Sequence, residues 1–128
     1  LQLDSMRVIR NMKWTRSSLL MTKYFTVAQK QYETSQISRN ELIEVIDCLT
    51  ALATSETGKS LTEYLGILND MTEKNGTFDE VLLLAVIRSI GKLGEKSAFD
   101  NLLYVILYQG YPDSIISASK EALAKLNW

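Results

Sequence analysis

A short helical pattern of apolar residues recurs along this 128-residue chain, and it limits the possible folds more than any other feature of the sequence. It is clearest in EVIDCLTALA (44–53), AVIRSIGKLG (85–94) and ASKEALAKLN (118–127), where apolar residues follow at steps of three and four. A repeat of 33 to 41 residues predicts helix pairs that stack on their neighbours, because a single pair cannot bury its own apolar face. The last apolar position of the pattern falls at Met12, Leu52, Leu93 and Leu126.

The same periodicity predicts an all-α chain of about seven helices. The run VLLLAVI (81–87) is also compatible with a buried strand, but the apolar pattern continues at helical steps through Ile90 and Leu93, which favours a helix. The helices are expected at about 1–13, 16–32, 41–53, 60–72, 78–93, 97–108 and 112–127.

Glycine and proline residues mark several of the expected helix ends. We expect Gly76 and Gly94 to end helices in the left-handed conformation. Gly110 and Pro112 are expected to separate the last two helices, since proline cannot continue the helix that precedes it.

The stretch YPDSIISASKEALAKLN (111–127) resembles the HEAT repeats. It has a Pro-Asp helix start, Ala118 and Ala122 on the packing face, and Ala-Leu-x-x-Leu before the turn; AVIRSIGKLG (85–94) matches half of this pattern. The resemblance implies a right-handed, armadillo-like α-solenoid of antiparallel helix pairs that fills residues 1–128 as one domain. The expected repeat units are about 1–38, 39–75, 76–110 and a partial unit at 111–128. Since the last unit is a lone first helix, we expect the chain to be a fragment of a longer protein.

The composition argues against catalysis. The chain has no histidine, which removes the commonest general base and the commonest metal ligand. Its single cysteine, Cys48, lies on an apolar helical face, where a small buried side chain is expected rather than a reactive thiol. We therefore expect no enzyme activity, no catalytic residue, no cofactor and no metal. HEAT-like phycobilin lyases and metal-dependent hydroxylases remain distant alternatives. The hydroxylases of this kind bind their metal through His-Glu ligands, so the absence of histidine argues against them in particular.

The stretch ATSETGKS (53–60) matches the loose form of the phosphate-binding P-loop. A P-loop needs a hydrophobic strand before it, however, and the preceding residues 41–53 have helical periodicity. We instead expect Ala53 to end one helix, Gly58 to relax the turn, and Ser60 with Glu63 to form a capping box at the start of the next helix.

Basic residues gather at the beginning of the chain. The first 30 residues hold six basic residues and one acidic residue, although the whole chain has a net charge of −1. These basic residues could bind an acidic protein surface or nucleic-acid phosphates, or they could form a solvated helix face. HEAT-like DNA glycosylases show that such a fold does not exclude nucleic acid, but the overall charge disfavours it. The candidate binding residues here are Arg7, Arg10, Lys13, Arg16 and Lys23, and Lys30 continues the series.

Tyrosines form a second candidate surface. They fall on the second helices of the expected repeats, which in HEAT-type solenoids commonly line the partner-binding face. Tyrosine presents rigid, amphipathic contact area to a partner; the alternative is packing between repeats with the hydroxyl at the rim. The residues are Tyr24, Tyr32, Tyr64, Tyr104 and Tyr108, together with Phe25.

These observations predict a non-catalytic scaffold that binds another protein, or another domain of its parent chain, on the solenoid surface. The alternative is a binder of nucleic acid or another anionic ligand through the basic N-terminal helices. No apolar run reaches the ~20 residues of a membrane span, so we expect a soluble protein, with a cytoplasmic location favoured. Any targeting signal would lie outside this stretch.

Overall fold

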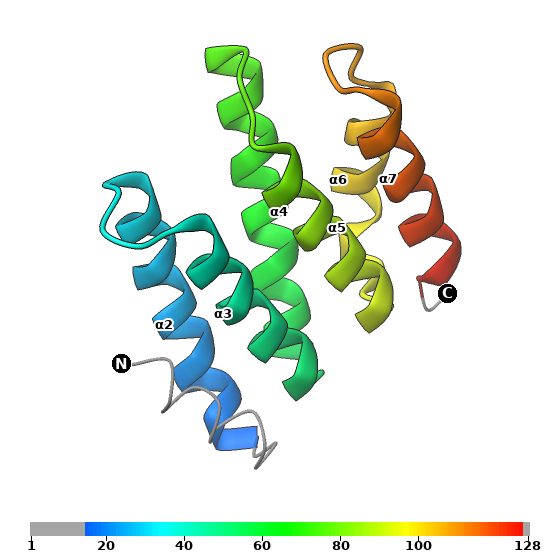
Figure 1. Ribbon diagram of the computed structural model, residues 1–128. Helices are drawn as coiled ribbons and strands as arrows, with labels where there is room; N and C mark the ends of the chain where they lie inside the picture. The colour runs from blue at the N-terminus through cyan, green and yellow to red at the C-terminus, as the bar shows by residue number, and fades with distance from the viewer. Residues whose placement is uncertain (1–14, 127–128) are drawn as a thin grey trace. The chain divides into compact units, whose positions relative to one another are not determined.

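The computed structural model describes residues 15–126, and in this part of the chain every regular element is a helix (Figure 1). The all-α prediction is therefore confirmed for the described residues. They form six α-helices and one short 3₁₀ helix, rather than the seven helices expected for the whole chain; the helix expected at 1–13 lies outside them. The elements are α2 (Thr15–Glu33), α3 (Arg39–Leu52), α4 (Ser55–Asn75), α5 (Glu80–Leu93), η1 (Lys96–Ala98), α6 (Phe99–Leu107) and α7 (Asp113–Lys125).

Most helix ends follow the local signals in the sequence. Gly76 and Gly94 adopt positive φ values of 70° and 68°, as expected for residues that end a helix. Pro112 is the N-cap of α7, and the run 81–87 lies within α5 rather than in a strand. A capping box that the sequence analysis did not identify begins α3: the backbone N–H of Glu41 donates to Ser38 Oγ at 3.2 Å, and the Ser38 N–H donates to the Glu41 carboxylate at 3.3 Å.

The beginning of α4 corrects the sequence prediction. The helix starts at Ser55, so Ser60 lies inside it and the predicted Ser60 capping box is wrong. Two threonines cap the helix instead: the Thr54 N–H donates to Thr57 Oγ1 at 3.0 Å, and the Thr57 N–H donates to Thr54 Oγ1 at 3.3 Å. Because this pair already caps the helix ahead of Ser60, Gly58 lies inside the helix and does not relax a turn.

The chain divides into two compact units after Gly58, inside α4. In the described part of the first unit, α2 and α3 pack as an antiparallel pair (Figure 1). The buried face of α2 contains Met21, Phe25 and Ala28, at the helical steps of four and three. That a single domain spans the chain stays a prediction. The buried residues of α3 are Leu42, Val45, Ile46, Cys48, Leu49 and Leu52.

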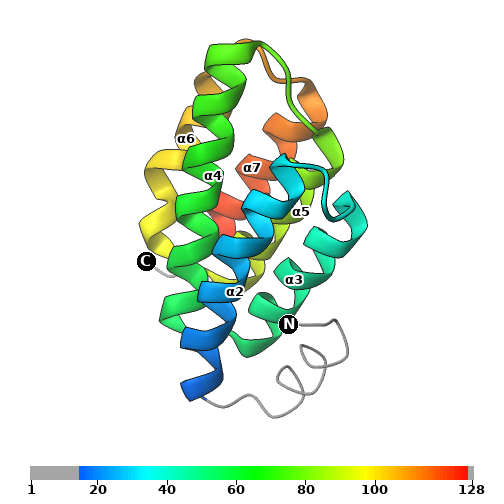
Figure 2. The same cartoon turned by 90° about the vertical axis from the view of Figure 1, so that its left-hand side faces the viewer.

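In the second unit, from Lys59, four helices form two layers. Helices α4 and α6 lie together in one layer and α5 and α7 in the other, with α7 packed against both α5 and α6 (Figures 1 and 2). Each fully buried aliphatic side chain contributes roughly 1.5–3 kcal/mol of burial free energy, which makes this core the main source of stability. The core includes Leu61, Leu65, Leu82, Leu83, Val86, Ile87, Ile90, Leu102, Val105 and Ile115.

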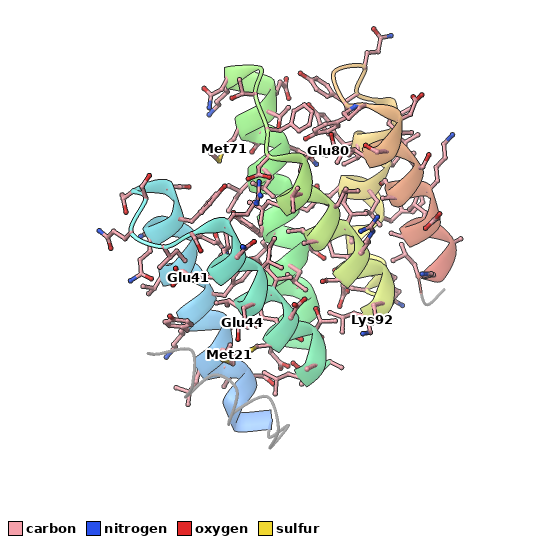
Figure 3. All side chains as sticks on the ribbon, in the orientation of Figure 1. Met21, Glu41, Glu44, Met71, Glu80 and Lys92 are labelled. Carbon is pink, nitrogen blue, oxygen red and sulfur yellow. The ribbon has the colours of Figure 1, made fainter. Side chains whose placement is uncertain are left out.

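Helices α5 and α7 approach closely at a glycine. A Cβ atom at Gly91 would lie 3.0 Å from Cα and 3.1 Å from Cβ of Ala122. The small residues therefore bring the two backbones nearer than larger side chains would allow. Glu80 stands in the first turn of α5 and Lys92 near the other end of that helix (Figure 3). Ser114 Oγ donates to the Glu80 carboxylate at 3.0 Å, which joins the first turns of α5 and α7.

Candidate interaction site

Helices α4 and α6 finish at the end of the second unit where α5 and α7 begin (Figure 1). Four aromatic side chains gather at this end. We call Phe78, Tyr104, Tyr108 and Tyr111 the aromatic cluster. The Tyr104 and Tyr108 rings are stacked, with centroids 5.5 Å apart and an angle of 13° between their planes. The Tyr111 ring meets Tyr108 and Phe78 edge to face, each at 5.2 Å. These separations fall in the range of favourable aromatic pairs, so the rings stabilise one another's positions.

Tyr111 anchors the cluster to α4. Its side chain is buried, with 4% of its surface exposed, and its hydroxyl donates to Oδ1 of Asn69 at 2.8 Å. The same hydroxyl lies 3.2 Å from Oγ1 of Thr72. Burial raises the pKa of Tyr111 above its usual value. A buried hydroxyl with two partners fixes the ring that supports the rest of the cluster.

Asparagines continue this polar contact along the α4–α6 interface. The side-chain amide of Asn101 on α6 donates to the backbone carbonyl of Thr62 at 3.0 Å. The side-chain amide of Asn69 on α4 donates to the backbone carbonyl of Asn101 at 3.4 Å. Each bond joins one helix to the other, and together they set the register in which α6 lies along α4.

Tyr104 forms the outer part of the cluster. Its hydroxyl donates to a carboxylate oxygen of Glu73, on the last turn of α4, at 2.7 Å. This hydrogen bond to a negative group is the main reason why the pKa of Tyr104 is raised to about 12. The hydroxyl is therefore a donor across the whole physiological pH range, and it holds the Tyr104 ring against the end of α4.

The Tyr108 ring lies close to the backbone of Gly110. A Cβ atom at Gly110 would collide with Cε2 of the Tyr108 ring. The absence of a side chain at Gly110 therefore leaves room for this ring, which contacts both Tyr104 and Tyr111. The sequence prediction treated Gly110 only as a helix break.

The structure brings together two of the five predicted tyrosines. Tyr104 and Tyr108 stack on each other and are half-buried. Tyr64 is 3% exposed and belongs to the core, so its prediction as a partner contact is corrected: its position on α4 points it inward beside Leu61 and Leu65. Tyr24 and Tyr32 are half-buried in the first unit, where burial and then the Glu41 carboxylate raise the pKa of Tyr24.

Phe25 and Cys48 belong to the core of the first unit. Both are completely buried. The expectation that Cys48 is a buried residue is confirmed, and Phe25 offers no surface to a partner.

The basic candidates are described only in part. Lys23 is exposed on α2, and Lys30, two helical turns later, is exposed on the same face. Arg16 belongs to α2, but its side chain is outside what the structure describes. Arg7, Arg10 and Lys13 lie outside the described residues.

Three members of the site were not predicted from the sequence: Phe78, Tyr111 and Glu73. A signal for Tyr111 was present, because Tyr104, Tyr108 and Tyr111 follow at steps of four and three, the spacing of one helical face. Because the helix ends at Leu107, these three tyrosines do not lie on one continuous helix, and the spacing is not recognised as a helical face. Nothing near Glu73 in the sequence distinguishes it from other exposed carboxylates.

Residues 15–126 contain no group of three or more cysteine, aspartate or glutamate side chains that could hold a metal ion. Among the described helices, none has the length and hydropathy needed to cross a membrane.

Comparison with known proteins gives no relative. No family model, no curated protein and no solved structure matches the chain.

Proposed function

We propose that this protein is a non-catalytic interaction module that binds another protein, or another domain of its parent chain, through the aromatic cluster. The observation that carries the proposal is the stacked pair of Tyr104 and Tyr108, half-buried and fixed in place at the end of the second unit. Tyrosine is enriched among the residues that dominate binding energy, because its ring is large, rigid and apolar while its hydroxyl stays hydrated.

Preorganisation is the second support. Each tyrosine is held by different contacts: Tyr104 by Glu73, Tyr108 by the rings of its two tyrosine neighbours, and Tyr111 by Asn69. A partner therefore does not have to order these side chains when it binds, and the entropy cost of association falls accordingly.

For the architecture, we propose the HEAT-like α-solenoid implied by the sequence resemblance. The repeated apolar pattern supports it, and so do the two layers of the second unit, in which α4 and α6 run one way and α5 and α7 run the other (Figure 1). In such an arrangement α4 and α6 are second helices of neighbouring repeats, and the cluster lies where both end. Affinity would then be spread over adjacent repeats.

A second candidate is binding of nucleic acid or another anionic ligand through α2. The exposed lysines Lys23 and Lys30 on one face of that helix favour it. It predicts binding to a nonspecific DNA duplex that weakens steeply with salt, and no retention at low salt would end the idea.

Selection from a displayed library of random peptides tests the main proposal. We expect the protein to select peptides whose affinity falls about tenfold or more in Tyr104→Ala and in Tyr108→Ala, as for central interface tyrosines. Tyr32→Ala is the matched control, since it removes a half-buried tyrosine from the first unit. Thermal unfolding of each variant shows that it remains folded.

The opposite pattern would overturn the proposal. If folded Tyr104→Ala and Tyr108→Ala proteins bind the selected peptides as tightly as the unaltered protein, the cluster is not the binding surface. If Lys23→Ala and Lys30→Ala abolish binding instead, the second candidate replaces the first.

A further inference from the structure

We propose that the group recognised by the aromatic cluster is cationic: an arginine side chain of a peptide segment, with its guanidinium against the Tyr104–Tyr108 stack on the Tyr104 side and paired with Glu73. This inference rests on the proposed function and names the chemistry of its partner. Three observations in the second unit support it: a carboxylate with unused hydrogen-bond acceptor positions, a pair of stacked tyrosine rings, and the carboxyl ends of two helices.

The carboxylate is that of Glu73. It accepts a hydrogen bond from the Tyr104 hydroxyl, and within residues 15–126 it forms no ion pair with a lysine or arginine. A carboxylate has about four acceptor positions, so one hydroxyl leaves most of them free. Lys74 is the next residue along α4, but adjacent residues point about 100° apart around a helix and do not face each other. The side chain of Glu73 is exposed, so a ligand can reach it.

The rings of Tyr104 and Tyr108 supply the second feature. They are stacked with their planes 13° from parallel, so one face of each ring meets the other ring and a ligand would contact an outer face of the stack. The face of an aromatic ring is the negative part of its quadrupole and attracts a cation within about 6 Å of the centroid. Both rings are half-buried, which lowers the local dielectric and strengthens the attraction relative to a fully hydrated ring.

The helix ends supply the third feature. Helix α4 ends at Asn75 and α6 at Leu107, which places Glu73 and Tyr104 in the last turns of their helices. The carboxyl end of a helix carries a partial negative charge and favours cations. Glu73 therefore lies where the helix dipole disfavours a carboxylate, and a bound cation would relieve this repulsion.

Arginine fits these features better than lysine. Its guanidinium is planar, so it can stack on a tyrosine ring while its edge donates two hydrogen bonds to a carboxylate. A lysine ammonium is a strongly hydrated point charge and satisfies one of these contacts at a time. Met71, although exposed on α4, lies on the side away from α6 and takes no part in this arrangement (Figure 3).

Titration of the ¹⁵N-labelled protein with short blocked peptides tests the inference. The probes are acetyl-Gly-Arg-Gly-amide, its citrulline analogue, which has the same shape without the charge, and its lysine analogue, all at one ionic strength. We expect the arginine peptide to shift the amide signals of Glu73, Tyr104 and Gly110 with a Kd on the order of millimolar, because one exposed cation–π contact is weak. The citrulline peptide should bind about fivefold more weakly or worse, and the lysine peptide between the two.

Two variants test whether the carboxylate of Glu73 supplies the negative charge that binds the guanidinium. Glu73→Gln should weaken binding of the arginine peptide about threefold to tenfold, in line with the loss of one ion pair beside a ring. Glu63→Gln is the matched control, because it makes the same change at an exposed site on α4 about 15 Å away, and it should alter Kd by less than about twofold. Tyr104→Phe keeps the ring and should retain binding, whereas Tyr104→Leu should lose it.

Equal binding of the arginine and citrulline peptides, or an unchanged Kd in Glu73→Gln, would overturn the inference. The proposed function would survive that result if library-selected peptides still required Tyr108. It would fail separately if no selected peptide depended on the cluster.

Discussion

In the second unit, the contacts between α4 and α6 differ in kind from the contacts between α5 and α7. On the α4–α6 side, asparagine and tyrosine side chains form hydrogen bonds from helix to helix, including those of Asn69, Asn101 and Tyr104. On the α5–α7 side, Gly91 and Ala122 form a close apolar contact along the helices, and a hydrogen bond from Ser114 to Glu80 joins their first turns. The polar side determines how the helices are aligned along their axes, whereas the apolar side determines how near they lie.

This difference has a consequence for function. Hydrogen bonds are directional, so the polar side can hold an exposed ring in one orientation, as Glu73 holds Tyr104. Dispersion and burial are not directional, and they tolerate small rotations of a side chain. The aromatic cluster is found on the side where orientation can be fixed.

The largest effect is expected from Tyr111→Phe. The change removes the hydroxyl and leaves Asn69 Oδ1 and Thr72 Oγ1 without their buried partner. We expect the free energy of unfolding to fall by about 2 kcal/mol, measured by urea denaturation. Tyr32→Phe, at a half-buried tyrosine of the first unit, is the control. A loss below about 0.5 kcal/mol for Tyr111→Phe would mean that the polar side does not depend on this hydroxyl.

A smaller effect is expected from Gly91→Ala, which tests the apolar side. Alanine favours a helix over glycine by roughly 0.5–1 kcal/mol, but its Cβ would press on the backbone of Ala122, and overpacking costs about 1–3 kcal/mol. We expect a net loss of about 1 kcal/mol.

Gly66→Ala is the matched change on the polar side. The three atoms nearest to the new Cβ would all belong to the side chain of Asn101, the nearest being Nδ2 at 3.3 Å, and this side chain can move slightly. The helix preference should then dominate, and we expect stability to be unchanged or raised by up to about 0.5 kcal/mol. Equal losses in both glycine variants would remove the contrast between the two sides.

The smallest effect concerns the ionisation of Tyr104. Its pKa is raised to about 12 in the folded protein, from an ordinary value of about 10, by its hydrogen bond to Glu73. The stability linked to the neutral hydroxyl is fully present below pH ~10 and is lost as the pH rises through the folded pKa. With ¹³Cζ-labelled tyrosine, the Tyr104 signal should titrate well above that of a free tyrosine, and Glu73→Gln should lower its pKa. An unchanged pKa in that variant would show that the hydrogen bond is absent in solution.

The helices could be predicted from sequence because their signals are local. The apolar steps of α5, the left-handed glycines Gly76 and Gly94, and Pro112 before α7 all act within one or two turns. The start of α4 was missed because the Thr54–Thr57 pair offers an earlier cap than Ser60. Two N-cap signals competed within a few residues, and the sequence pattern did not rank them.

The site could be predicted only in part. Tyr104 and Tyr108 were recognised by residue type, but the bond from Tyr111 to Asn69 joins residues 42 positions apart, and it has no local signature. The same reasoning grouped Tyr64 with the surface tyrosines, although its position beside Leu61 and Leu65 places it in the core. Residue type suggested the chemistry of the surface, whereas long-range packing selected which residues form it.

The location of the partner surface is tested most directly by an amide chemical-shift map of the ¹⁵N-labelled protein bound to a library-selected peptide. We expect the largest shifts at the ends of α4 and α6 and in the turn from Tyr108 to Tyr111, around the aromatic cluster. Shifts confined to α2, around Lys23 and Lys30, would contradict this location and would assign binding to the basic face of the first unit instead.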